Sequence, residues 1–271
     1  MNDAISQGQI SRNVTVHDRL ARKYDALHGE IFNDVEQARL HDALTTARDA
    51  VQTGADPVEA LDFGCGSGNL SRHLLELGTS VTAADVSPGF LELVASRYGS
   101  KKLRTLHMIG GDLSGVPDAS FDLIATYSVL HHIPDYLAAC SELARLCKPG
   151  GVVMIDHEQN EAYWRSEPSY RAYWSAGMRT DWRKFLTPSN YVHRLRRVLN
   201  PRYTNEGDIH VFADDHIEWD KIKAVFAGAG FDVVREDDYL LYRLLCRPEV
   251  FDRYKDEITD TKAMIFRKRA G

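Results

Sequence analysis

The sequence predicts an α/β fold in which a doubly wound, mostly parallel sheet of seven strands is covered by helices. Between residues 60 and 155, short strand-like runs alternate with amphipathic helical segments, which is the pattern of a parallel sheet with helices on both faces. A glycine-rich loop follows the first of these runs directly. Two more strand-like runs, 232–242 and 263–267, lie near the C-terminus and complete the seven.

The remaining elements are expected where the apolar periodicity is clearest. Apolar or β-branched runs bounded by glycine, proline or polar residues predict five earlier strands, at 60–63, 81–86, 105–109, 121–127 and 151–155. Apolar positions spaced by three or four residues predict four core helices, at 70–77, 90–98, 135–147 and 215–229. Pro149 and Gly150 end the third of these helices, because proline stops a helix and glycine tolerates positive φ.

Three regions are expected along the chain. Residues 1–52 carry apolar positions spaced mostly by three to five and predict an N-terminal helical cap. Residues 53–158 and 214–271 form the core, and 159–213 form an insert after the fifth strand, where the alternation of strands and helices breaks. The insert is expected to be a substrate lid or a small packed subdomain, and it is rich in aromatic residues: Tyr163, Trp164, Tyr170, Tyr173, Trp174, Trp182, Phe185, Tyr191 and Tyr203.

Composition argues against several classes of protein. The 271-residue chain has a formal net charge of -6, which disfavours a broad nucleic-acid-binding face. Its four cysteines lack disulfide-framework or zinc-ligand spacing, and no run approaches the roughly 18 apolar residues of a membrane span. We therefore expect an unprocessed cytoplasmic protein without a nucleic-acid or membrane partner. A local basic cluster is expected to be a solvated helix face or an anion site: Arg194, Arg196, Arg197 and Arg202.

The segment from Asp62 to Gly68 has the features of a ligand-binding loop. Gly64, Gly66 and Gly68 stand at alternate positions between a buried strand and a helix, where glycine lets the backbone bend sharply and approach a ligand. The alternative is that the loop is only a tight turn. A dinucleotide-binding loop needs its third glycine one residue later, at Asn69, which disfavours NAD as the ligand.

Acidic residues follow the next two strands at the same edge of the predicted sheet. Asp85 ends the second strand about 20 residues after the loop, and a carboxylate there can accept both hydroxyl groups of a ribose. Asp112 follows the third strand and is placed to accept a hydrogen bond from an adenine amino group. Together with the glycine loop, these residues predict a site for an adenosine-containing cofactor.

Over residues 60–155 the chain resembles the class I S-adenosylmethionine-dependent methyltransferase superfamily, in particular its small-molecule methyltransferases with a Leu-His-His-Ile-Pro-Asp segment, which stands here at 130–135. The resemblance implies a Rossmann-like fold and S-adenosyl-L-methionine as cofactor. It also implies a set of cofactor-binding residues: Tyr24, Asp62, Gly64, Cys65, Gly66, Gly68, Asp85, Val86, Asp112, Leu113, Tyr127 and Ser128. For Tyr24, a core-facing position in the cap is the alternative.

The acceptor is expected beyond the ends of the fourth and fifth strands, where His131, His132 and Asp156 would meet. If the acceptor is a hydroxyl group, one of these residues is expected to remove its proton. Otherwise the two histidines only order the segment that follows the strand. Asp156, His157 and Glu158 are not expected to bind a metal, because adjacent strand residues point to opposite faces.

These features predict a methyltransferase that acts on a small molecule. The simplest reaction is O-methylation of a hydroxyl group on a sugar or a secondary metabolite. Methyl transfer to carbon or nitrogen by proximity, without a base, is the alternative. An NAD(P)-dependent oxidoreductase and a non-catalytic cofactor-binding protein are two further alternatives.

Overall fold

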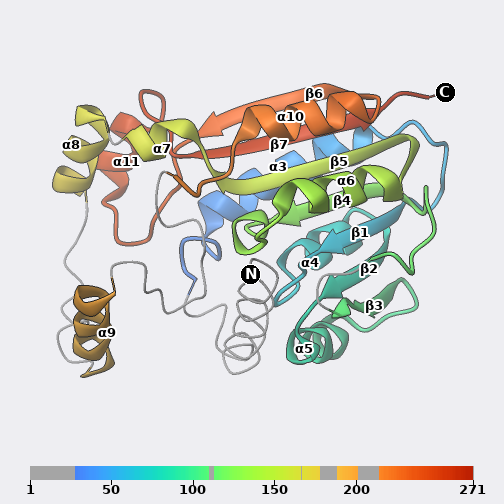
Figure 1. The fold of residues 1–271 in the computed structure, drawn as a ribbon, viewed down its shortest axis with the longest axis horizontal. Coiled ribbons are helices and arrows are strands. Elements are labelled where there is room, and N and C mark those ends of the chain that lie inside the picture. Colours follow the sequence, from blue (N-terminus) through green and yellow to red (C-terminus); the bar gives the residue numbers. More distant parts are fainter. Residues whose placement is uncertain (1–27, 110–112, 166, 178–187, 201–213, 271) are drawn as a thin grey trace.

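The computed structural model describes residues 28–109, 113–165, 167–177, 188–200 and 214–270 (Figure 1). A seven-stranded sheet lies at its centre, in the order β3-β2-β1-β4-β5-β7-β6. Strands β1 to β5 are parallel, whereas β7 runs antiparallel to both of its neighbours, β5 and β6. The predicted α/β doubly wound fold is confirmed.

All seven strands overlap the runs that predicted them. The central strands β1 and β4 are buried almost throughout, which explains their continuous apolar sequences. Side chains alternate between the two faces, so that Ala60 and Leu61 of β1 belong to different apolar clusters. The strands are β1 Glu59–Phe63, β2 Ser80–Asp85, β3 Leu103–His107, β4 Phe121–Tyr127, β5 Cys147–Gln159, β6 Phe231–Tyr239 and β7 Thr261–Lys268.

Helices cover both faces of the sheet. On one face, α3 (Asp34–Asp49), α4 (Asn69–Glu76) and α5 (Pro88–Tyr98) bury their apolar sides against the strands. On the other face, α6 (Tyr136–Leu146) and α10 (Trp219–Gly228) pack on the sheet and on each other. Four of these five helices lie where the apolar periodicity predicted core helices, and α3 lies within the predicted cap.

Polar side chains fix the starts of several helices. The side chain of Asn33 accepts a hydrogen bond from the backbone N–H of Glu36 at the start of α3. Ser87 caps α5 in the same way, with Pro88 in the first turn, and Asp135 caps α6. Because α5 and α6 follow β2 and β4, their caps also hold the loops at the carboxyl edge of the sheet.

The described part of the insert forms three short helices. Aromatic side chains of the second one pack on α11 (Pro248–Tyr254), a helix that the sequence periodicity did not predict because it is so short. Among all the residues that the structure describes, no helix is long and apolar enough to cross a bilayer. The division into cap, core and insert stays a prediction. The three helices are α7 Glu161–Arg165, α8 Pro168–Gly177 and α9 Pro188–Leu199.

The insert leaves and rejoins the core at one point. Strand β5 continues past its predicted end to Gln159, through a register shift between Ile155 and Glu158 where His157 has a φ of 61°. The indole Nε1 of Trp219, the first residue of α10, donates to the carbonyl of Gln159 at 2.9 Å. This hydrogen bond joins the start of the insert to α10, the helix that follows it.

Candidate functional site

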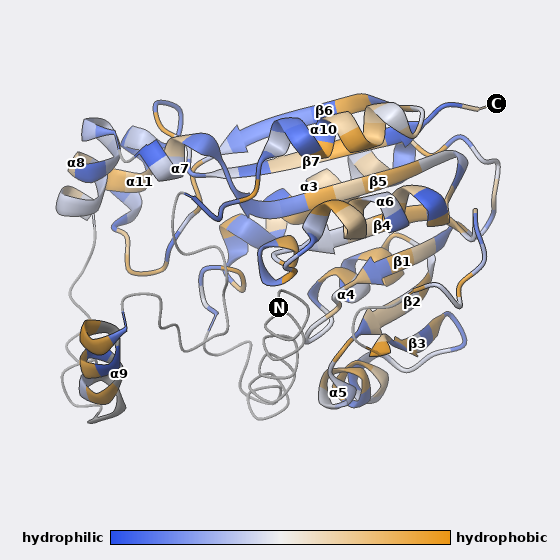
Figure 2. Cartoon of the chain, in the orientation of Figure 1, coloured by the Kyte–Doolittle hydropathy of each residue, from blue (hydrophilic) through white to orange (hydrophobic). Residues whose placement is uncertain are grey.

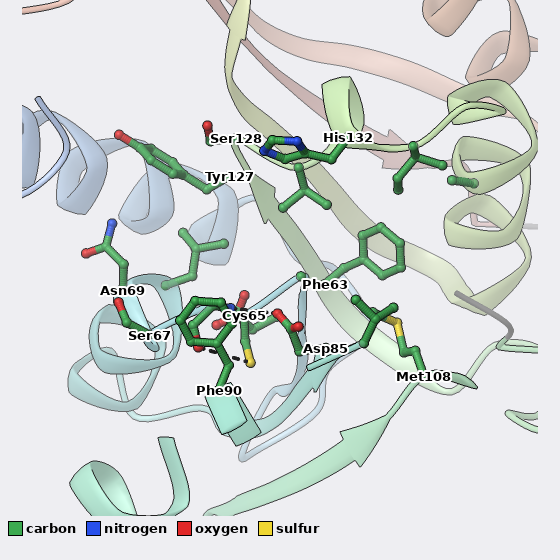
Figure 3. A pocket seen from close by; sticks show the side chains of 18 of the residues that line it. Phe63, Cys65, Ser67, Asn69, Asp85, Phe90, Met108, Tyr127, Ser128 and His132 are labelled. Carbon is green, nitrogen blue, oxygen red and sulfur yellow. Dashed lines mark hydrogen bonds between the residues drawn. The ribbon is translucent and has the colours of Figure 1, made fainter. Parts of the chain in front are cut away.

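A cavity of about 320 Å³ opens at the carboxyl ends of β1, β2 and β4 (Figure 3). This is the edge at which open parallel sheets bind their ligands. Tyr24 and Asp112 lie outside the described residues, and Gly68 is not part of the described wall. The other predicted cofactor residues all line the cavity: Asp62, Gly64, Cys65, Gly66, Asp85, Val86, Leu113, Tyr127 and Ser128.

The glycine loop brings bare backbone to the wall of the cavity. Gly64 and Gly66 have φ values of 74° and 49°, in the left-handed region that favours glycine. A Cβ atom on Gly64 would lie 2.5 Å from the side chain of Val129, whereas one on Gly66 would meet nothing within 4 Å. Gly68 instead makes room for the ring of Tyr98 on α5. The three glycines therefore have different roles, and Gly66 is the one that leaves space for a ligand.

Asp85 joins the end of β2 to the glycine loop. Its Oδ2 accepts a hydrogen bond from the backbone N–H of Gly66 at 2.9 Å, and its Oδ1 accepts one from Ser87 at 2.8 Å. The residue is 6% exposed and lines the cavity. Because a carboxylate has about four acceptor sites, Asp85 can also accept hydrogen bonds from hydroxyl groups of a ligand.

Asp62 at the end of β1 has no exposed surface. Its Oδ2 accepts a hydrogen bond from the hydroxyl of Ser71 at 2.6 Å, whereas its buried Oδ1 has no hydrogen-bond partner among the described residues. Burial raises the pKa of this carboxyl to about 7, against the opposing effect of the bond from Ser71. A buried acceptor without a donor is costly, so a ligand group that donates to Oδ1 would be stabilised here.

Apolar side chains form a slot beside Asp85. Phe90 of α5 and Met108 after β3 are both almost fully buried, and both line the cavity (Figure 3). Aromatic and thioether surfaces of this kind suit a planar ring. The sequence did not single out Phe90 or Met108, because an apolar residue in a helix or after a strand has no signal that distinguishes a cavity wall from the core.

Tyr127 and Ser128 leave β4 at the wall of the cavity. The ring of Tyr127 stacks on that of His157, with centroids 4.6 Å apart. Burial, with the carboxylate of Asp156 nearby, raises the pKa of the Tyr127 phenol well above its usual value, so the group is neutral. Ser128 has a φ of 60°, and its N–H donates to the carbonyl of Asp156 at 3.0 Å. The chain therefore turns sharply before the two histidines.

Of the three candidate catalytic residues, only His132 lines the cavity. His131 turns to β5, where its Nδ1 lies 2.8 Å from Oε2 of Glu158. Glu158 is 1% exposed, and its Oε1 accepts hydrogen bonds from the backbone N–H groups of Val129 and Leu130. The rings of His131 and His132 are tilted against each other, with centroids 4.0 Å apart. Glu158 therefore fixes His131, and His131 packs on the histidine in the wall.

Asp156 belongs to a separate buried network. Its Oδ2 pairs with Nη1 of Arg39 at 3.0 Å, and its Oδ1 accepts a hydrogen bond from the hydroxyl of Tyr239 at 2.9 Å. The guanidinium of Arg39 also lies 3.9 Å from the centroid of the Tyr239 ring. The carboxylate beside the histidines is therefore Glu158, whereas Asp156 was expected there. The register shift at His157 explains this difference, because it changes the direction in which the side chains after Ile155 point.

Comparison with known proteins agrees with this arrangement. Residues 61–155 match the family described as methyltransferase domain. The chain is 38% identical over 99 residues to the malonyl-[acyl-carrier protein] O-methyltransferase of Serratia marcescens. This alignment covers 36% of this chain and 37% of that protein. It is 32% identical over 156 residues to a demethylmenaquinone methyltransferase of Staphylococcus epidermidis, and this alignment covers 56% of this chain and 62% of that protein. A solved S-adenosylmethionine-dependent methyltransferase from Mesorhizobium loti has a TM-score of 0.54 at 17% identity and covers 84% and 96%.

Residues 61–155 of this chain belong to the methyltransferase domain family. The matches bear out the predicted resemblance to class I S-adenosylmethionine-dependent methyltransferases, and the family implies use of S-adenosylmethionine. The match spans only 37% and 62% of the lengths of the two curated relatives. The acceptor of this methyltransferase therefore has to be argued from its own site.

The wall of the methyltransferase cavity offers what this cofactor requires. The unpartnered oxygen of Asp62 suits an amino group, and the open space at Gly66 suits a ligand that approaches the backbone. Asp85 suits ribose hydroxyls, and the slot formed by Phe90 and Met108 suits adenine. The residues present therefore fit the cofactor.

The segment after β4 lines another part of the cavity. His132 is followed in the wall by Ile133, Pro134 and Asp135, and α6 adds Ala138. None of the described residues between 159 and 200 lines the cavity. The described helices of the insert therefore lie outside the wall, and the lid stays a prediction.

Proposed function

We propose that this methyltransferase transfers the methyl group of S-adenosyl-L-methionine to a hydroxyl group of a small-molecule acceptor. The observation that carries the proposal is the position of His132 in the cavity wall, beside a second histidine that a buried carboxylate holds in place. An imidazole is suited to remove a proton near neutral pH. The Serratia relative is named as an O-methyltransferase, which supports oxygen as the acceptor atom.

In this proposal the cofactor lies along the carboxyl edge of β1 and β2. Asp62 accepts from the amino group of its methionine half, Asp85 accepts from the ribose hydroxyls, and Phe90 and Met108 enclose the adenine. The remaining contacts are expected from Gly64, Cys65, Gly66, Val86, Leu113, Tyr127 and Ser128. The roles of Tyr24, Gly68 and Asp112 stay predictions from the resemblance.

The chemistry asks little of the protein beyond alignment. When bound, the cofactor supplies a sulfonium methyl group that is already electrophilic. The protein then has to align the acceptor, exclude water and take up the hydroxyl proton. His132 takes up this proton as the new carbon–oxygen bond forms. His131 is a positioning residue, because the carboxylate of Glu158 fixes its ring and this ring packs against that of His132.

The acceptor that fits best is a metabolite with a hydroxyl group beside an apolar portion, such as a sugar-bearing or other secondary metabolite. Ile133, Pro134 and Ala138 make the rim next to His132 apolar. Asp135 and Glu142 also line the cavity; Asp135 caps α6 and Glu142 pairs with Arg145, and their remaining acceptor sites suit further hydroxyl groups. An acceptor that is both apolar and polyhydroxylated matches this combination.

Turnover with methyl-labelled S-adenosylmethionine and a panel of hydroxyl, amine and carbon acceptors tests the proposal. We expect label in a hydroxyl acceptor, and we expect His132→Ala to lower the transfer rate at least about 10²-fold. Cofactor affinity, measured by calorimetry, should stay unchanged. The matched control is His107→Ala, at an exposed histidine of β3, which should transfer like the wild type.

Other outcomes would replace the proposal. Transfer only to carbon or nitrogen acceptors, at a rate that His132→Ala leaves unchanged, would establish catalysis by proximity. Cofactor binding without transfer to any acceptor would favour a non-catalytic binding protein. Binding of NADH in place of S-adenosylmethionine would favour an oxidoreductase.

A further inference from the structure

Helix α9 presents a stripe of large apolar side chains to solvent. The helix is 12 residues long and stands apart from the sheet in Figure 1. Leu195 is 61% exposed, Val198 is 74% exposed and Leu199 is 77% exposed. Tyr191 and Val192 extend the stripe and are also exposed. Single exposed apolar residues need no explanation, but five on one short helix mark a binding surface.

The stripe is one-sided and is bordered by positive charge. Positions 191, 192, 195, 198 and 199 have the spacing i, i+1, i+4, i+7 and i+8, so they occupy about a third of the helix circumference. Arg194 and Arg196 follow on its two sides, and both are exposed. The helix sequence contains no acidic residue. Figure 2 shows that α9 contains both hydrophobic (orange) and hydrophilic (blue) residues.

We propose that α9 binds the surface of an anionic lipid bilayer, with the apolar stripe at the acyl boundary and the arginines at the lipid phosphates. Apolar side chains flanked by arginines are typical of helices that lie in the plane of a membrane interface. At 1.5 Å per residue, α9 is about 18 Å long, which is too short to cross a hydrocarbon core of about 30 Å. The helix therefore lies on the membrane.

Charge complementarity favours lipid over a second copy of this chain. The chain as a whole carries a formal net charge of -6, so an anionic surface repels most of the protein while it attracts α9. This difference orients the molecule with α9 toward the bilayer. Two copies of α9 would instead bring their arginines together, which is unfavourable. The inference replaces the expectation of no membrane partner, because the composition argued against a spanning segment and not against a surface helix.

Helix α8, which precedes α9 in the chain, buries its aromatic face against other parts of the protein. Tyr173 is completely buried and Tyr170 is 8% exposed, and both pack in the cluster formed with α11. In α9 the side chains of Leu195 and Val198 are of similar apolar character but lack such burial. The stripe on α9 is therefore a surface for an external partner, whereas the aromatic face of α8 is buried against α11 and its neighbours.

Co-sedimentation of the full chain with sucrose-loaded vesicles tests the proposal. We expect binding to vesicles of phosphatidylglycerol and phosphatidylcholine that is at least about tenfold tighter than binding to phosphatidylcholine alone. Leu195→Glu, which places a charge in the stripe, and Arg194→Glu, which reverses a bordering charge, should each weaken the anionic-vesicle affinity at least about tenfold. The matched control is Val233→Glu on the edge strand β6, where the native residue is 49% exposed. This variant should bind vesicles like the wild type.

Three results would overturn the proposal. The first is a wild-type protein that sediments with neither kind of vesicle, and the second is a Leu195→Glu variant that sediments as the wild type does. The third is self-association of the wild type, seen by light scattering without vesicle binding, that Leu195→Glu abolishes; the stripe would then be a contact between two copies. Neither measurement involves methyl transfer, so its outcome is independent of the proposed acceptor chemistry.

Discussion

Nδ1 of His131 lies 2.8 Å from Oε2 of Glu158, and the other oxygen of this carboxylate holds the backbone of the segment that carries the histidine. We expect Glu158→Gln to preserve the backbone bonds, because its amide oxygen can still accept them. The amide NH₂ group of the new glutamine would then donate to Nδ1 of His131 and favour the opposite tautomer of the imidazole ring. The transfer rate should fall at least about tenfold, which is less than the loss of a general base. Nitrogen chemical shifts of His131 report the tautomer, and an unchanged tautomer with an unchanged rate contradicts the positioning role.

Gly64 and Gly66 provide a matched pair for testing the glycine loop. Gly66→Ala places its Cβ in open space, so we expect loss of cofactor binding with only about 1–2 kcal/mol of destabilisation from the positive φ. Gly64→Ala meets the same backbone penalty and also collides with Val129, so its melting temperature should fall further. Gly64→Ala with Val129→Ala should recover part of this loss. Normal cofactor affinity in Gly66→Ala, measured by calorimetry, would reduce the loop to a structural turn.

Asp85 should contribute strongly to cofactor affinity. In Asp85→Ala the charge-assisted hydrogen bonds to the proposed ribose hydroxyls are lost, which costs about 2 kcal/mol, or about 30-fold in Kd. Calorimetry of the folded variant measures this change. The control is Asp220→Ala, whose carboxylate is 95% exposed on α10 and should bind the cofactor normally. Equal affinity in both variants would remove Asp85 from the site.

The raised pKa of Asp62 predicts that cofactor affinity depends on pH. The carboxyl of the free protein ionises near pH 7, because burial disfavours its charge. An amino group of the cofactor binds better to the carboxylate than to the neutral acid, so affinity should increase as the pH rises from about 6 to about 8. Asp62→Asn should bind more weakly and lose this dependence. Any titration of the cofactor itself affects both proteins equally. The difference between their calorimetric pH profiles therefore gives the contribution of Asp62.

The burial of His73 on α4 should make the protein less stable in mild acid. His73 is 3% exposed, and burial together with Arg72 lowers its pKa to about 4. Because the unfolded chain takes up this proton near pH 6.5, stability should fall as the pH drops from about 6.5 to about 4. His73→Gln should show a smaller decrease in melting temperature between pH 7 and pH 5, whereas His107→Gln at an exposed site should behave as the wild type. Identical slopes in all three proteins would contradict the buried neutral histidine.

The features that the sequence predicted are those with a local signal. The sheet follows from short apolar runs, and the glycine loop and Asp85 follow from their positions at strand ends. The pairing of His131 with Glu158 was missed because it depends on a register shift within β5. No local sequence pattern predicts such a shift. Phe90 and Met108 were missed because an apolar residue looks the same in a core and in a cavity wall. The ion pair of Arg39 with Asp156 joins residues far apart in the chain, which periodicity cannot connect.

The hydrogen bond from Trp219 to the carbonyl of Gln159 has an evolutionary consequence. The excursion between these residues begins and ends at neighbouring points, and the cost of closing a flexible loop increases by only about 0.6 kcal/mol when its length doubles. A change in the length of this stretch therefore adds little to its closure cost, although α8 within it packs on α11 outside it. The match to the methyltransferase domain family stops at residue 155, just before the excursion starts. A sequence change in this stretch can accordingly leave the cofactor cavity intact, since none of the described residues between 159 and 200 lines it.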